Sequence, residues 1–280
     1  MSTPVNSEKP WSLEGKSALV SAASRGIGKA IAIYFARKGL ANIAITYASN
    51  KAAAEDTLAK VRALGVRNAI ALRADATDGA AWPGVVADAL AGLGVPAIDI
   101  LVNNAIQGDI SRYLPLAQTG VEAFTEAMVA NVYSPVATTL AYLERAAPRG
   151  GGGGGRVINI SSVAGEIANE DPVVTYGASK AALQSFTRSF AGSFASERGV
   201  TFNSVVVGPT ATDAIQQAFE AYGDEFKRKH TAEVSAAPRI GEVEDIAYIV
   251  GFLASEEGRW VNGAAVSANG GYRSTLAALG

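Results

Sequence analysis

Tyr176 and Lys180, in the segment "TYGASK", have side chains that could act together in acid–base chemistry. In a helix, residues four positions apart lie on the same face, so this phenol and this ammonium would be neighbours. A free tyrosine has a pKa of about 10, and a nearby positive charge lowers that pKa because it favours the phenolate. The pair could therefore give a proton to an oxygen atom of a substrate. The spacing alone also fits an ordinary surface pair of Tyr and Lys.

Two further polar residues precede this pair. Ser162 lies fourteen residues before Tyr176, in "INISSVAG", where an expected strand ends, and Asn131 lies thirty-one residues before Ser162, in "FTEAMVANVYSP". Taken singly, Ser162 fits a turn former and Asn131 fits a helix residue bonded to the backbone. All four residues in this order, after a glycine turn, favour one common site.

The glycine turn lies in "LVSAASRGIGKAIA", which has the pattern of a strand, a tight turn and a helix. Gly26 and Gly28 allow the backbone to approach a pyrophosphate, and a helix that begins near Ile27 would point its free amides at that group. Such turns usually carry a further glycine four residues before Gly26, where this chain has Ala22. We predict that Ala22 lies in a nearly extended part of the chain and that the turn still binds its nucleotide. The alternative is an ordinary tight turn between a strand and a helix, which binds no nucleotide.

Composition excludes several classes of protein. The 280 residues have a net charge of −2, no cysteine and one histidine, and 49% of them are apolar. Disulfides and thiolate metal sites are therefore excluded, a zinc site is disfavoured, and no basic face for nucleic acid is indicated. No apolar run reaches the ~18 residues that span a bilayer, and the N-terminus has no apolar signal core. We expect a cytoplasmic protein that binds no metal, no nucleic acid and no membrane.

Short β-rich runs alternate with longer helical stretches along the chain. This order predicts an α/β fold: one Rossmann-type, doubly wound parallel sheet of about seven strands with helices on both faces. The expected strands are 17–20, 42–46, 69–73, 98–102, 156–160, 201–207 and 264–268, and the expected helices are 28–38, 52–64, 82–91, 121–147, 179–197 and 243–254. Residues 13–280 would form one catalytic domain behind an N-terminal tail, residues 1–12.

Four features outside this pattern have simple interpretations. The polar, weakly helical segment 209–240 follows a strand and is expected to be a substrate lid that decides specificity. Six glycines at 150–155 precede a strand and no helix follows them, so we interpret them as a flexible connection and not a phosphate site. His230 is expected to be an exposed lid residue and Trp260 a packing residue, although His230 could also contact substrate.

The chain resembles the short-chain dehydrogenase/reductase family, from about residue 13 to residue 272. The resemblance rests on "SAASRGIG", "LVNNA", "NVYSP", "INISS", "YGASK", "NSVVVGPTATD" and "VNGAAVSANGGY". Within the family the chain is similar to ketoacyl carrier-protein reductases and, more closely, to fungal polyketide and hydroxynaphthalene-type ketone reductases. The resemblance implies reduction of a small-molecule carbonyl compound with NADP(H), and a homotetramer or a homodimer.

The resemblance also assigns a role to each catalytic residue. Tyr176 would be the general acid, and Lys180 would lower its pKa and bond the nicotinamide ribose. Ser162 would hold the substrate oxygen, and Asn131 would hold a water that links Lys180 to solvent.

The resemblance further implies the cofactor contacts. NAD-preferring proteins place an acid just after the second strand, whereas here the first acid is Glu55. Arg25 in the turn pairs well with a 2′-phosphate, although a solvated turn residue is the alternative. The residues expected at the dinucleotide are Ala22, Ser24, Arg25, Gly26, Ile27, Gly28, Tyr47, Ser49, Asn50, Asp75, Ala76, Asn104, Ala105, Ile106, Tyr176, Lys180, Gly208, Thr210 and Thr212.

Three departures from the family pattern lie close to the expected cofactor. Ser21-Ala22 replaces Thr-Gly, Ile106 replaces glycine, and Val207 replaces proline. They leave two alternatives open beside ketone reduction: a family member recruited to a non-redox step such as cyclisation or isomerisation, and a catalytically silent dinucleotide-binding regulator.

Overall fold

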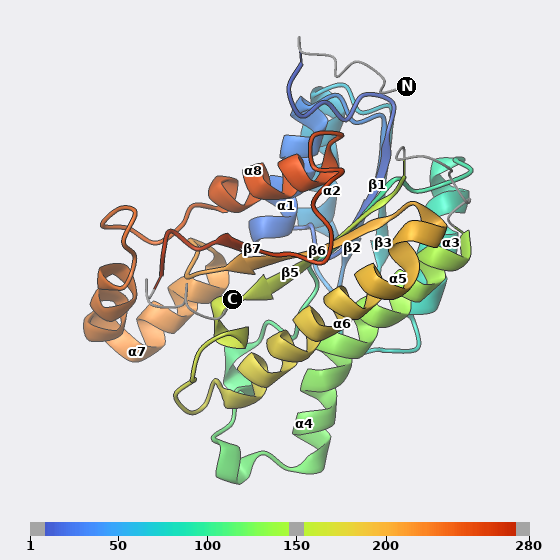
Figure 1. Ribbon diagram of the computed structural model, residues 1–280. Coiled ribbons are helices and arrows are strands. Elements are labelled where there is room, and N and C mark those ends of the chain that lie inside the picture. Colours follow the sequence, from blue (N-terminus) through green and yellow to red (C-terminus); the bar gives the residue numbers. More distant parts are fainter. Residues whose placement is uncertain (1–8, 146–153, 273–280) are drawn as a thin grey trace.

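The computed structural model describes residues 9–145 and 154–272 and contains one parallel sheet of seven strands (Figure 1). The strand order is β3-β2-β1-β4-β5-β6-β7, and every neighbouring pair is parallel. The strands are β1 (Ser17–Val20), β2 (Asn42–Tyr47), β3 (Asn68–Arg73), β4 (Ile100–Asn103), β5 (Arg156–Ser162), β6 (Thr201–Val207) and β7 (Ala265–Ala268). This confirms the predicted α/β, doubly wound fold.

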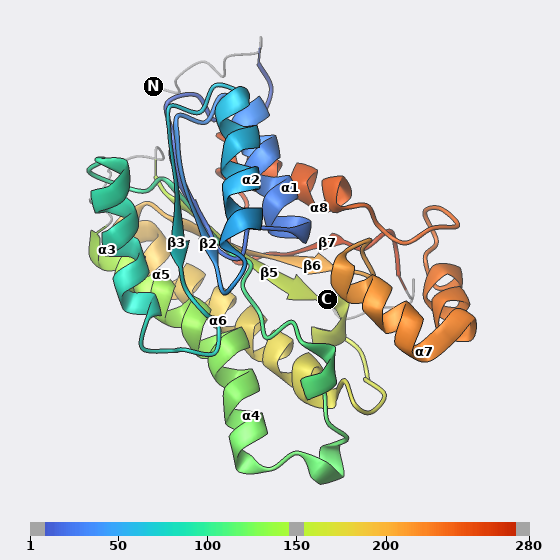
Figure 2. The same cartoon turned by 180° about the vertical axis from the view of Figure 1, so that it is seen from behind.

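Helices cover both faces of the sheet (Figures 1 and 2). One face carries α1 (Gly26–Arg37), α2 (Lys51–Ala63) and α8 (Val243–Ala254). The other face carries α3 (Trp82–Leu93), α5 (Ser134–Arg145) and α6 (Val174–Arg198), with α4 (Val121–Met128) extending beyond the sheet. Each face has its own apolar core, because a parallel sheet must be covered on both sides.

The helix predicted over 121–147 is wrong in one respect, because the structure divides it. α4 is followed by a π-helical turn, η3 (Val129–Tyr133), and then by α5, while residues 146 and 147 lie outside the described part of the chain. Pro135 has no N–H to donate to the carbonyl of Asn131, four residues earlier, so a regular α-helix cannot continue through this point. π-Helical turns of this kind occur frequently at functional sites.

A buried chain of polar side chains ties the middle of the sheet to α5 and α6. The Asn103 Nδ2 donates to the Asn159 Oδ1 at 2.8 Å and to the Thr139 Oγ1 at 3.1 Å. The Asn159 Nδ2 donates to the Thr187 Oγ1 at 2.8 Å, and the Thr187 and Ser204 hydroxyls are hydrogen-bonded to each other at 2.8 Å. The chain crosses β4, β5 and β6 and fixes α6, the helix that carries Tyr176, against the strand ends.

The N-terminal segment and the glycine run are described only in part. Residues 1–8 and 150–153 lie outside the described residues, and the description resumes at Gly154. Within the N-terminal segment, the Trp11 N–H donates to the Glu257 Oε1 at 3.0 Å and its ring lies edge-on to Phe252. At the end of the glycine run, a Cβ at Gly155 would lie 1.8 Å from the Tyr142 hydroxyl, so close packing requires this glycine.

The carboxyl ends of the strands face three further segments. α7 (Asp213–Ala232) lies in the segment that was expected to form a lid, and it is interrupted at Gly223, where φ is +80°. The loop after β4 contains two short 3-10 turns, η1 (Ile110–Arg112) and η2 (Leu116–Gln118), and β5 is followed by η4 (Val163–Gly165). Strand order reverses between β1 and β4, so ligands of such sheets bind at this edge. Within the described ranges, no helix is both long and apolar enough to cross a bilayer.

Candidate active site

The structure brings the four predicted catalytic residues to one edge of the sheet. Tyr176 and Lys180 lie one turn apart on α6, as their spacing predicts. Ser162 ends β5 and caps η4, where its hydroxyl accepts a hydrogen bond from the Ala164 N–H at 3.2 Å. Asn131 lies in the π-helical turn η3.

Tyr176 lies between Ser162, to which it is hydrogen-bonded, and the stacked ring of Tyr113. Burial raises the pKa of its phenol, and the hydrogen bond between Tyr176 and Ser162 lowers that pKa in part. The expectation that Lys180 lowers this pKa is therefore wrong for the structure as described, because desolvation of the phenol dominates. A phenol with a raised pKa stays protonated at neutral pH, which is the form that can donate to a carbonyl oxygen.

Lys180 is almost completely buried, with 2% of its surface exposed. Its Nζ donates to the Ile160 carbonyl at 2.8 Å and lies 5.7 Å from the centre of the Tyr176 ring. Burial lowers the pKa of the ammonium to about 7. Lys180 can therefore both accept and release a proton near neutral pH, next to the phenol.

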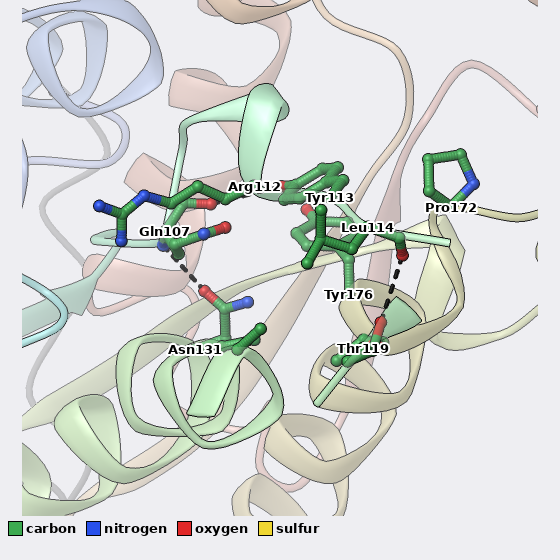
Figure 3. A pocket seen from close by; sticks show the side chains of 11 residues that line it. Gln107, Arg112, Tyr113, Leu114, Thr119, Asn131, Pro172 and Tyr176 are labelled. Carbon is green, nitrogen blue, oxygen red and sulfur yellow. Dashed lines mark hydrogen bonds between the residues drawn. The ribbon is translucent and has the colours of Figure 1, made fainter. Parts of the chain in front are cut away.

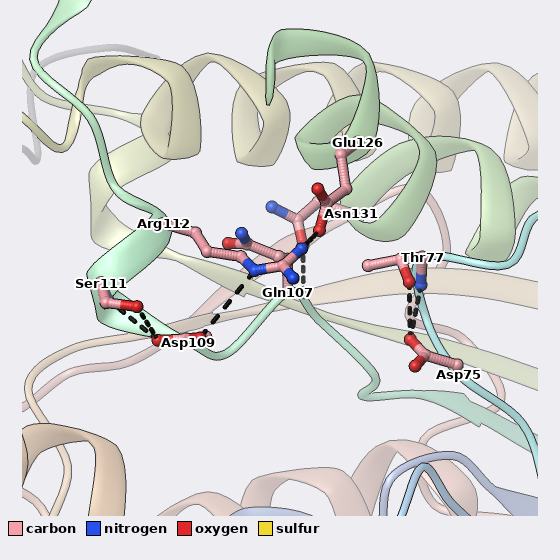
Figure 4. A network of polar contacts seen from close by, with 8 residues as sticks. All are labelled: Asp75, Thr77, Gln107, Asp109, Ser111, Arg112, Glu126 and Asn131. Carbon is pink, nitrogen blue, oxygen red and sulfur yellow. Dashed lines mark hydrogen bonds and ion pairs between the residues drawn. The ribbon is translucent and has the colours of Figure 1, made fainter. Parts of the chain in front are cut away.

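The Asn131 side chain is engaged by the protein at both ends. Its Oδ1 accepts a hydrogen bond from the Gln107 N–H at 3.0 Å (Figure 4). Its Nδ2 donates to the Ser179 hydroxyl at 3.0 Å. Ser179 in turn donates to the Tyr176 carbonyl at 2.6 Å. Asn131 thus joins the loop after β4 to the first turns of α6, which makes it a positioning residue here. Its expected role toward a water remains a prediction.

Ala22 does not have the backbone conformation predicted for it. Its φ is +50°, in the left-handed region, and not nearly extended. An L-residue in this region costs roughly 1–2 kcal/mol relative to a right-handed conformation. The missing glycine is therefore a strained position. Ala22 still makes the turn, because its N–H donates to the Thr46 hydroxyl at 2.9 Å.

We expect Ala22→Gly to raise the melting temperature by a few degrees. Glycine relieves the strain at φ +50°, and this gain is larger than the loss that comes from the greater entropy of the unfolded chain. The dissociation constant of NADPH should fall by no more than about tenfold, because a strain energy of this size corresponds to about a tenfold change in a dissociation constant. Calorimetry and fluorescence titration measure the two effects. Ala48→Gly is the control, because Ala48 is exposed and has no positive φ. A wild-type protein that binds no NADPH, beside a variant that does, would contradict the prediction.

Two residues hold the turn against the end of β4. The Ser21 hydroxyl accepts the N–H groups of Asn104 and Ala105 at 2.8 and 2.9 Å. The Asn104 Nδ2 donates to the carbonyls of Ser21 and Ala22 at 3.0 and 3.2 Å. A Cβ at Gly28 would lie 2.7 Å from this Nδ2, so the glycine is needed for the turn itself. Ser21 was noted only as a departure from the family pattern, and its role emerges from these contacts.

The remaining predicted cofactor residues surround the same edge. Tyr47 ends β2, Ser49 is exposed after it, and the Asn50 side chain caps α2 by accepting the Ala53 N–H at 2.9 Å. The exposed Asp75 and the buried Ala76 follow β3, and Asp75 accepts both the N–H and the hydroxyl of Thr77 at 2.9 Å (Figure 4). Ile27 lies in the first turn of α1. The loops after β1, β4 and β6 contain the other predicted positions, which are Ser24, Ala105, Ile106, Gly208, Thr210 and Thr212.

Residues of this edge fit a dinucleotide. The N-terminus of α1 has no side-chain cap and no acidic residue in its first turn, so its first N–H groups can bind a phosphate. Arg25, at the N-cap position, is exposed and lies 3.3 Å from the Asp213 carboxylate at the start of α7. Thr212 contacts the other side of the turn, since a Cβ at Gly26 would lie 3.5 Å from its methyl group. A bound NADP would supply or accept a hydride at this edge.

A pocket beside Tyr176 contains residues that were not predicted (Figure 3). The Tyr113 ring stacks on the Tyr176 ring with centres 5.5 Å apart and planes at 29°. Gln107 and Arg112 come from the same loop after β4, and Thr175 precedes Tyr176. None of the described residues of this pocket comes from 209–240. This part of the site is lined by the loop after β4, by α4 and η3, and by Pro172 and the start of α6, and not by the expected lid.

Known proteins match this chain over nearly its whole length. A family model described as Enoyl-(Acyl carrier protein) reductase matches residues 21–273. The short chain dehydrogenase penD of Penicillium thymicola is 50% identical over 273 residues, 98% of this chain and 97% of that protein. The short chain dehydrogenase asqE of Emericella nidulans is 50% identical over 272 residues, 97% of this chain and 99% of that protein.

A solved structure gives the same result for the fold. The short chain dehydrogenase from Burkholderia cenocepacia, in complex with NADP, superposes with a TM-score of 0.79 at 32% identity, over 92% of this chain and 98% of that one. With matches over nearly its whole length, the chain belongs to the short-chain dehydrogenase/reductase family of NAD(P)-dependent oxidoreductases.

Proposed function

We propose that the protein reduces a ketone to a secondary alcohol with NADPH. The observation that carries this proposal is the Tyr176 phenol, kept protonated by burial, hydrogen-bonded to Ser162 and open to a pocket. Bound NADPH would supply the hydride that adds to the carbonyl carbon. Tyr176 gives its proton to the carbonyl oxygen, which Ser162 holds beside the phenol, and the product is the alcohol. Lys180, with a pKa of about 7, returns a proton to the phenolate.

The experiment that tests this proposal follows NADPH absorbance with a panel of cyclic and aromatic ketones, together with NADPH binding. Consumption of NADPH that depends on a ketone is the expected result. Tight binding of NADPH without consumption by any ketone would instead support a non-redox role with the cofactor as scaffold, or a silent regulator.

NADPH is expected to bind more tightly than NADH, because no acid follows β2 and Arg25 lies beside the turn. Arg25→Ala should narrow this preference by about tenfold, the effect of losing one charge-assisted contact with a 2′-phosphate. Dissociation constants for both cofactors measure the change. Arg37→Ala removes an exposed positive charge at the far end of the same helix and is the matched control. A wild-type preference for NADH would overturn the assignment of Arg25, Tyr47 and Ser49.

We propose a homotetramer, or a homodimer, that forms on the apolar face of α4, η3, α5 and α6. Exposed Phe124, Tyr133, Leu140 and Phe186 lie on these elements. An apolar groove of about 330 Å³ opens among Phe124, Tyr133 and Phe186. Continuous exposed apolar patches of this kind are typical of interfaces, and a second copy of the chain supplies the same surface in a symmetric pair.

Light scattering at micromolar concentration should therefore report more than one chain per particle. Phe186→Glu should dissociate the particle, because the carboxylate would be buried without a partner. Leu64→Glu, at an exposed apolar residue just after α2, should leave the assembly unchanged. A monomeric wild-type protein would contradict this proposal.

A further inference from the structure

Gln107 lines the pocket, and side chains of the site engage both of its backbone groups. Its N–H donates to the Asn131 Oδ1 at 3.0 Å, and its carbonyl accepts a hydrogen bond from the Tyr113 hydroxyl at 3.3 Å. Both partners belong to the site, since Asn131 lies in η3 and Tyr113 stacks on Tyr176. The bond to Asn131 does not involve Tyr113, so it holds the Gln107 backbone beside the pocket even when the Tyr113 ring moves.

The Gln107 carboxamide has no hydrogen-bond partner among the described residues. Only 7% of the residue is exposed, and its side chain lies in the pocket between those of Arg112 and Asn131 (Figure 3). The carboxamide atoms are not among the described buried side-chain atoms that lack a partner, so they remain accessible. An accessible carboxamide that no protein group engages can donate to and accept from a ligand that enters the pocket.

Two neighbouring polar side chains, those of Arg112 and Thr119, are already engaged by the protein. Arg112 pairs with Glu126 and lies 3.9 Å from the Asp109 carboxylate (Figure 4). The Thr119 hydroxyl donates to the carbonyls of Leu114 and Pro115 at 3.3 and 3.1 Å.

The shape of the pocket indicates a flat ligand. In this structure the space beside Tyr176 holds the ring of Tyr113, and the cavity that remains is only about 20 Å³, about the size of one water. This space therefore accepts a flat aromatic ring. A substrate ring that takes the same place would displace Tyr113 and present its edge to the carboxamide of Gln107.

We propose that Gln107 is a specificity-determining residue, which binds a second polar group of a flat cyclic ketone while Tyr176 protonates the reacting carbonyl. The inference rests on the proposed ketone reduction and names its substrate class: a ring ketone with an additional carbonyl or N–H group on the ring. A carboxamide offers both a donor and an acceptor, so either group can be bound. Loop residues after β4, and not the segment 209–240, then select the substrate.

The test compares two ketones in wild type and in Gln107→Leu. Isatin carries an additional carbonyl and an N–H on its ring, and 1-indanone carries neither. In Gln107→Leu we expect kcat/KM for isatin to fall by about tenfold to a hundredfold, mainly through KM, because the lost hydrogen bonds act in a buried site. The value for 1-indanone should stay the same or rise. NADPH binding should not change, which shows that the variant is folded.

Two further variants complete the design. Gln118→Leu, at an exposed glutamine of η2 in the same loop, should behave as wild type with both ketones. Gln107→Glu keeps the size and one acceptor, so it should retain more isatin activity than Gln107→Leu. An equal loss with isatin and 1-indanone in Gln107→Leu, or no loss with either, would overturn the inference.

Binding separates this inference from the proposed function. Isatin is titrated into wild-type and Gln107→Leu protein loaded with NADP⁺, where no hydride is transferred. Isatin binding that is about tenfold weaker in the variant supports the role of Gln107, whether or not either ketone is reduced. If neither ketone is reduced, only the proposed ketone reduction is contradicted. Equal isatin binding by the two proteins, or none by either, would contradict the role of Gln107.

Discussion

Tyr176→Phe is expected to lower kcat for ketone reduction by at least about a hundredfold, with little change in the dissociation constant of NADPH. General acid catalysis typically contributes 10²–10⁴, and the phenol is the proton donor beside the pocket. The ring itself remains, so its stacking on Tyr113 is kept. Steady-state kinetics with NADPH and a reduced ketone from the panel gives kcat, and fluorescence titration gives the dissociation constant.

The control for this variant is Tyr222→Phe, which removes a hydroxyl from an exposed tyrosine on α7. It should keep the wild-type kcat. A loss of less than about tenfold in Tyr176→Phe would contradict the assignment of the phenol as general acid.

Lys180→Met is expected to lower kcat by at least about tenfold and to change how stability depends on pH. The folded pKa of Lys180 is about 7, below the value of 10.5 for a free lysine, because the ammonium is buried. Between these two values the unfolded chain binds more protons than the folded one, so the free energy of unfolding of the wild type rises with pH. Methionine has no proton to bind, so this rise is lost in the variant.

Denaturant unfolding of the cofactor-free proteins measures this difference. From about pH 7 to about pH 9 the wild type should gain about 2 kcal/mol relative to Lys180→Met, with the variant the more stable of the two at the lower pH. Tyr176 does not interfere, because its pKa is raised and it stays protonated over this range. Parallel pH curves for the two proteins would show that Lys180 has no depressed pKa.

Much of the fold could be predicted from the sequence because alternation of apolar runs reports burial directly. The expected strands correspond to the seven observed strands, with limits that differ by at most two residues. Tyr176 and Lys180 lie one turn apart, as their spacing requires. The roles of Ser162 and Asn131 beside this pair came from the family resemblance. Chain spacing alone does not show that the end of a strand lies beside a particular helix.

Features that the sequence did not reveal depend on contacts across the fold. The π-helical turn at Asn131 could have been suspected from Pro135, which cannot complete the α-helical bond, but its register depends on packing. The left-handed conformation of Ala22 is imposed by the turn between β1 and α1, against the preference of alanine. Gln107 and Tyr113 gave no local signal, because a glutamine and a tyrosine in a loop are ordinary until Tyr176 is placed beside them.

The pKa values show the same limit. Spacing predicted that Lys180 would act on Tyr176 through its charge, whereas burial raises the pKa of the phenol and lowers that of the ammonium. Desolvation depends on everything packed around a group, which a sequence pattern does not contain.

Transfer of deuterium from labelled NADPH decides whether the protein reduces ketones. The enzyme is incubated with a ketone of the panel and NADPH in which both hydrogens of the hydride-donating carbon are deuterium, and the product is analysed by mass spectrometry and NMR. Ketone reduction places one deuterium on the carbinol carbon for each NADPH consumed, and this transfer should be greatly slowed in Tyr176→Phe. A product without deuterium, formed while NADPH is bound and not consumed, would contradict ketone reduction and assign the site to non-redox chemistry.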